Sequence, residues 1–76
     1  MTGPGIAKRS VTIAGHRTSV SLEEPFWNAL GEIARERGVS LGGLVAQVDA
    51  GRGGQNLSSA LRLHVLADLR QKAARD

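Results

Sequence analysis

The sequence predicts a mainly helical protein with a short β ribbon, in which two short strands precede three helices. Two runs near the N-terminus alternate between apolar and polar residues, as strands with one buried face do. Three later segments repeat their apolar residues at helical spacing. The length of 76 residues corresponds to one domain, which we expect over residues 8–76 after a flexible tail at residues 1–7.

The predicted strands are Arg9–Ile13 and Arg17–Leu22, with a turn at Ala14–His16 between them. Val11 and Ile13 share one face of the first run. In the second run, successive side chains again point to opposite sides. Its apolar face consists of Thr18, Val20 and Leu22, and its polar face consists of Arg17, Ser19 and Ser21.

The first helix is predicted from Glu24 to Arg37. Pro25 is tolerated in the first turn of a helix, and Gly38 is a typical helix terminator. Trp27 lies beside the apolar stripe of this segment, so we interpret it as a packing residue rather than a platform for base stacking.

The second helix is predicted from about Leu41 to Ala50, with Ser40 as its N-cap. A glycine-rich loop follows, and the third helix is predicted from about Leu57 to Ala74, capped by Asn56 or Ser58. Apolar residues cover more than half of the circumference of the third helix. This breadth predicts burial on more than one side, which a dimer interface would explain.

The composition excludes several classes of protein. The chain has no cysteine, which rules out a disulfide scaffold and thiolate metal sites. His16 and His64 have no acidic neighbour at the spacing of a known metal or catalytic motif, so we expect no enzyme, no metal and no cofactor. No apolar run is long enough to span a bilayer and no signal peptide is evident, so we expect a cytoplasmic protein without a membrane partner.

The positive charge is concentrated in the strand region. Residues 1–22 contain Lys8, Arg9 and Arg17 and no acidic residue, whereas residues 23–76 contain seven basic and seven acidic side chains. The whole net charge of +3 therefore lies on the strands. A basic ribbon beside a neutral helical body favours contact with nucleic-acid phosphates.

The order strand, helix, Gly-Val-Ser, helix resembles the ribbon-helix-helix superfamily of bacterial and phage DNA-binding proteins. The segments Lys8–Ser19 and Asn56–Arg62 resemble a small, poorly characterised branch of it. The resemblance implies an intertwined homodimer in which one strand of each subunit pairs antiparallel and the polar strand face enters the major groove of double-stranded DNA. We expect the core of that dimer to contain Val20, Leu22, Trp27, Leu61 and Val65.

Family members usually have one strand and two helices, so either strand of this chain could be the ribbon. We favour Arg17–Leu22, because it joins the first helix directly. This choice makes Arg17, Ser19 and Ser21 the base-contacting residues, with Arg17 the strongest candidate since a guanidinium bonds both acceptors of guanine. The competing ribbon, Arg9–Ile13, would present Ser10 and Thr12 together with Lys8.

The phosphate contacts have two possible locations as well. The resemblance implies a clamp of backbone amides at the start of the second helix, at Ser40 and Leu41. Because the third helix also resembles the family's usual second helix, the clamp could instead lie at Ser58 and Ser59. Lys8, Arg9 and His16 are further candidates for phosphate contact.

Two functional hypotheses follow. The first is a homodimeric, sequence-specific DNA-binding protein that acts as a transcriptional repressor. The second is a protein-interaction module, such as an antitoxin-like partner of a toxin, with weak or no DNA binding. A basic ribbon favours the first hypothesis, and an exposed apolar patch favours the second.

Overall fold

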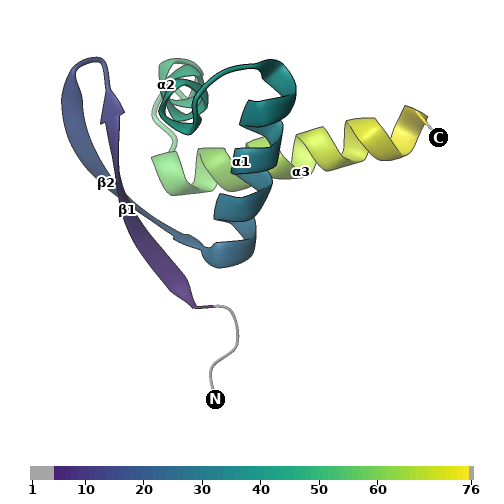
Figure 1. The fold of residues 1–76 in the computed structure, drawn as a ribbon, viewed down its shortest axis with the longest axis horizontal. Coiled ribbons are helices and arrows are strands. Elements are labelled where there is room, and N and C mark those ends of the chain that lie inside the picture. Colours follow the sequence, from purple (N-terminus) through teal and green to yellow (C-terminus); the bar gives the residue numbers. More distant parts are fainter. Residues whose placement is uncertain (1–4, 76) are drawn as a thin grey trace.

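The computed structural model describes residues 5–75 of the chain. Figure 1 shows a β hairpin with the helices packed against one of its faces, and the last helix runs away from the hairpin toward the C-terminus. Two antiparallel strands followed by three helices confirm the predicted fold class. The elements are β1 (Ile6–Ile13), β2 (His16–Glu23), α1 (Glu24–Arg37), α2 (Leu41–Gly51) and α3 (Leu57–Arg75).

The hairpin forms within one chain. β1 pairs with β2 from Ile6 opposite Glu23 to Ile13 opposite His16. Ala14 and Gly15 form the turn between them with φ of 52° and 83°, and two positive φ angles define the type I′ turn that suits two-residue hairpins. The partner strand that the family resemblance placed in a second subunit therefore comes from the same chain.

β1 is longer than the sequence predicted. It begins at Ile6 rather than at Arg9, so two residues of the predicted tail belong to the sheet. Residues 1–4 of that tail lie outside the described part of the chain. Trp27 on α1 extends the contact, because its Nε1 donates a hydrogen bond of 2.8 Å to the carbonyl of Ala7.

α1 has the predicted bounds. Gly38 ends it in the left-handed conformation, with φ of 71°, and its N–H bonds to the carbonyls of Ala34 and Arg35. Glycine adopts this conformation without strain, which explains the sharp end of the helix.

α2 and α3 begin with the same capping geometry. The Oγ of Ser40 accepts a bond of 2.9 Å from the N–H of Gly43, three residues later. The Oδ1 of Asn56 accepts a bond of 3.2 Å from the N–H of Ser59, also three residues later. Asn56, and not Ser58, is therefore the N-cap of α3.

One hydrophobic core joins the inner face of the hairpin to all three helices. Leu22, Leu30, Leu44 and Leu61 are completely buried in it. The remaining members of the core cluster are Val11, Val20, Trp27, Ile33, Ala34, Val45 and Val65. In the described part of the chain, no helix covers the outer face of the hairpin, so the side chains on that face are accessible to a binding partner.

Candidate nucleic-acid interface

Both strands contribute to the outer face of the hairpin. Alternation along each strand sends every second side chain away from the helices, and the register sets these side chains opposite one another. At the open end of the hairpin this set includes Ile6 and Glu23, which lie opposite each other, and Glu23 is paired with Arg62 of α3. The other six side chains are all exposed, and none is acidic. The cross-strand pairs are Lys8 with Ser21, Ser10 with Ser19, and Thr12 with Arg17. We call these six residues the ribbon face.

The two cations of the ribbon face have no acidic partner. Within residues 5–75, neither Lys8 nor Arg17 takes part in a salt bridge. An unpaired cation on an exposed strand keeps its full attraction for a phosphate or for the acceptor edge of a base. The ribbon face is therefore positively charged and rich in hydroxyl groups.

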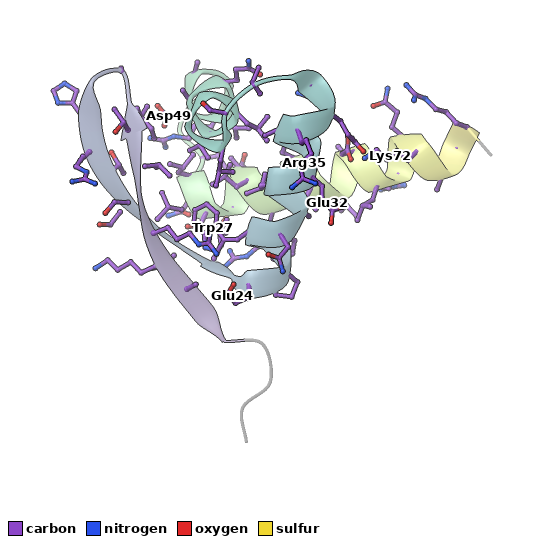
Figure 2. The ribbon with its side chains drawn as sticks, viewed as in Figure 1. Glu24, Trp27, Glu32, Arg35, Asp49 and Lys72 are labelled. Carbon is purple, nitrogen blue, oxygen red and sulfur yellow. The ribbon has the colours of Figure 1, made fainter. Side chains whose placement is uncertain are left out.

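Arg9 lies on the opposite face of β1. Its guanidinium carbon is 5.3 Å from the centre of the Trp27 ring, and Nη2 is 3.5 Å from a carboxylate oxygen of Glu24. Figure 2 shows both labelled partners on α1, on the side of the helix that meets the hairpin. Arg9 thus covers the indole ring of Trp27 and connects β1 to the first turn of α1.

The first turn of α2 lies beside β1. A Cβ built on Gly42 would be 3.8 Å from the carbonyl oxygen of Thr12, which is an ordinary van der Waals distance and places the first turn of the helix against the strand. A shallow groove of about 450 Å³ separates the two elements and is lined by Ser10 and Thr12 from the ribbon face. Ser40 and Leu41, the predicted phosphate contacts, form its other wall.

The first turn of α3 lies beside β2. The Oγ of Ser58 donates a bond of 3.1 Å to the carbonyl of Ser21. A second groove, of about 550 Å³, lies on this side and is lined by His16, Ser19 and Ser58. The two helix starts that the sequence offered as alternatives are both present, one beside each strand.

A bidentate ion pair holds the end of β2 against α3. Nε and Nη2 of Arg62 lie 2.9 Å and 3.2 Å from the two carboxylate oxygens of Glu23. The hydrogen bonds from Arg62 lower the pKa of Glu23 below its usual value of 4.5. Sequence analysis did not identify this pair, because the two residues are 39 positions apart and no local pattern links them.

The residues expected in a dimer core are all buried inside a single chain. Val20, Leu22, Trp27, Leu61 and Val65 are each at most 3% exposed. Packing between the hairpin and the helices of one chain accounts for their burial. Trp27 is a core residue, as predicted.

The two histidines are separate. His16 is exposed at the start of β2, whereas the Nε2 of His64 is buried and has no hydrogen-bond partner among the described residues. Burial lowers the pKa of His64 below 6.5; Arg37 acts in the same direction, and Asp68 opposes them. Among residues 5–75, no three His, Cys, Asp or Glu side chains gather into a possible metal site.

Comparisons with known proteins agree with this architecture. A family model described as a ribbon-helix-helix domain matches residues 6–69. The solved structure of an uncharacterized protein from Bordetella pertussis Tohama I is 30% identical in sequence and superimposes with a TM-score of 0.76. That match covers 96% of this chain and 63% of the Bordetella chain, so this chain spans less than two thirds of it. No curated protein matches the sequence.

Proposed function

The chain belongs to the ribbon-helix-helix family, and from this membership we propose that it binds double-stranded DNA through the ribbon face and acts as a transcriptional repressor. The matched family is a DNA-binding, regulatory fold, and it indicates no catalytic activity. A two-stranded ribbon is one of the elements that the major groove admits.

The single observation that carries the proposal is the chemistry of the ribbon face. It combines two unpaired cations with four hydroxyl side chains, and the helices are all on the other side. Arginine and lysine recognise the acceptor edge of guanine, and hydroxyls donate to or accept from bases. We propose that Arg17 reads a base and that Ser19 and Ser21 make weaker base contacts, with Ser10 and Thr12 beside them.

Phosphate contacts are proposed at the borders of the ribbon face. Ser40 and Leu41 lie at the start of α2, and Ser58 and Ser59 lie at the start of α3, where the first backbone N–H groups of a helix lack a partner within the helix. The N–H of Ser59 is already bonded to the Oδ1 of Asn56, which leaves Ser58 as the better backbone donor at α3. Lys8 and His16 add positive charge or hydrogen-bond donors near the backbone of the DNA. Arg9 contributes long-range attraction, since its guanidinium is already engaged with Trp27 and Glu24.

A second candidate function is protein interaction, and an apolar surface on α3 favours it. Leu63, Leu66 and Leu69 are 51%, 47% and 56% exposed at helical spacing. No residue of α3 beyond Val65 is buried. We propose that this surface joins two copies into a homodimer, because strand pairing is already satisfied within each chain. A toxin would be the competing occupant.

No helix of residues 5–75 is both long and apolar enough to cross a membrane. Access to chromosomal DNA requires a cytoplasmic location, which is part of the proposal.

A titration of random-sequence duplex DNA at low and high salt tests the proposed function. The expected result is binding that weakens steeply as salt rises, because neutralised phosphates release counterions. Failure to bind at low salt would leave the protein-interaction function as the better account.

A further inference from the structure

The two strands carry the same pattern of residues. Lys8–Ile13 reads Lys-Arg-Ser-Val-Thr-Ile and Arg17–Leu22 reads Arg-Thr-Ser-Val-Ser-Leu. On the ribbon face, each strand therefore presents a cation followed by two hydroxyl side chains. On the inner face, each presents a buried valine, Val11 in β1 and Val20 in β2.

The strand register turns this repeat into a two-fold symmetric surface. Ser10 lies opposite Ser19, and a two-fold axis through the middle of that pair relates residues at equal offsets in the two antiparallel strands. The axis exchanges Lys8 with Arg17, and Thr12 with Ser21. The two cations of the ribbon face thus lie at opposite ends of one diagonal.

The helix starts follow the same symmetry. The axis exchanges Thr12 with Ser21, and the second residue of a helix lies beside the backbone carbonyl of each. Gly42 of α2 packs beside the carbonyl of Thr12, and the Oγ of Ser58 of α3 donates a hydrogen bond to the carbonyl of Ser21. Each helix also places its N-cap two residues earlier, with the same bond back to the third residue of the helix. The same two-fold axis therefore relates the outward-facing strand residues, the first turns of α2 and α3, and the N-caps of these two helices.

The symmetry does not extend to the whole molecule. Within residues 5–75, α1 follows β2 and no helix precedes β1. Arg9 contacts Trp27, while Thr18, which the axis relates to Arg9, has no equivalent partner. The symmetric part is the surface that faces outward, and the asymmetric part is the body behind it.

We propose that one chain reads a short inverted repeat in duplex DNA, with the two-fold axis between Ser10 and Ser19 lying on the dyad of the site. This inference rests on the proposed function. A two-fold symmetric reading surface selects a DNA site with matching symmetry. In a ribbon built from two chains that symmetry requires a dimer, whereas here a single chain supplies both halves of the surface.

The spacing of the cations gives the size of the site. Lys8 and Arg17 are each two residues from the central pair, so at about 3.4 Å per residue they lie about 14 Å apart along the ribbon. This separation corresponds to about four base pairs at the 3.4 Å rise of B-DNA. Because arginine and lysine both favour guanine, the site contains a guanine on each strand at mirror-related positions. Lys8 then contacts a base as Arg17 does, and not phosphate alone.

Selection from random duplexes, followed by measurement of the number of chains per site, tests this inference. The selection uses the Leu66→Glu variant. Its new charge lies on the exposed surface of α3, where it is expected to prevent association between chains without changing the ribbon face. The expected result is an enriched inverted repeat of about four to six base pairs that holds one chain.

Matched variants locate the two halves of the site. Arg17→Ala is expected to weaken binding about five- to 150-fold and to remove the guanine preference in one half. Lys8→Ala should remove that preference at the mirror position in the other half. Arg35→Ala removes the same charge from an exposed position on α1, away from the hairpin in Figure 2, and should leave the selected sequence unchanged.

The possible failures are distinguishable. No enrichment of any duplex would refute the proposed function itself. An asymmetric enriched sequence would overturn the inverted-repeat inference while the proposed function stands. Two chains on one short repeat, or a loss for Lys8→Ala that is equal on all sequences, would overturn it as well.

Discussion

Replacement of Val20 by aspartate tests whether the inner face of β2 is part of a single-chain core. The side chain is 3% exposed, so the variant loses the burial of a valine, worth about 1.5 to 3 kcal/mol. It also buries a carboxyl group with no partner. If burial raises the pKa of that carboxyl from about 4 to 7, the cost at neutral pH is about 4 kcal/mol. The sum of about 5 to 7 kcal/mol rivals the entire stability of a domain of this length, about 4 to 11 kcal/mol.

The pH dependence of this variant has a definite sign. The new carboxyl has a higher pKa in the folded state than in the unfolded state, so its electrostatic cost grows as pH rises above about 4. We expect Val20→Asp to be largely unfolded at pH 7 and to regain structure near pH 4, as measured by circular dichroism and urea unfolding. Ser19→Asp is the matched control, since the neighbouring side chain is exposed on the ribbon face. A neutral-pH melting temperature for Val20→Asp equal to that of Ser19→Asp would refute the assignment of the inner face.

Three further predictions concern the site and the surface of α3. Arg17→Ala should cost about 1 to 3 kcal/mol of binding free energy on a preferred duplex and less on a scrambled one; equal losses on both would make Arg17 a phosphate contact. The lowered pKa of Glu23 means that its pair with Arg62 stabilises the fold fully above pH 4.5 and that this stability is lost as pH falls through the folded-state pKa. Glu23→Gln should therefore lower the melting temperature at pH 7 but not at pH 2, and the same decrease at both would exclude the ion pair as its cause. Sedimentation at micromolar concentration should show a dimer that Leu66→Glu converts to a monomer, and a dimer that survives this substitution would place the interface elsewhere.

The helices were predictable because their ends carry local signals. The stop of α1 at Gly38 and the caps at Ser40 and Asn56 depend on a few adjacent residues, and the structure places these ends within one residue of the prediction. Alternation likewise sufficed to sort the strand residues between two faces.

The pairing of the strands was not predictable from such signals. Ala14-Gly15 lacks the Asn-Gly or Asp-Gly pair that identifies a type I′ turn, and Ala14 adopts an uncommon positive φ. Without that signal, a second copy was an equally good source of the partner strand. For the same reason, the two strands were alternatives for the ribbon and the two helix starts were alternatives for the phosphate clamp. The hairpin brings all four to one surface.

The charge of Arg9 did not predict its contacts with Trp27 and Glu24. Its charge suggested a phosphate contact, but alternation from Val11 places it on the inner side of β1. The contact with Trp27 then depends on the long-range packing of α1 against the hairpin, which no local pattern reveals.

Binding of duplex DNA by the Ser19→Asp variant tests the central claim most directly. This substitution introduces a negative charge at the centre of the ribbon face and leaves the core untouched, so it separates DNA contact from folding. We expect the unaltered protein to shift the fluorescence anisotropy of a labelled duplex at low salt, Arg35→Ala to retain this binding, and Ser19→Asp to lose it while keeping the melting temperature of the unaltered protein. Undiminished binding by a folded Ser19→Asp variant would show that the DNA contacts another surface.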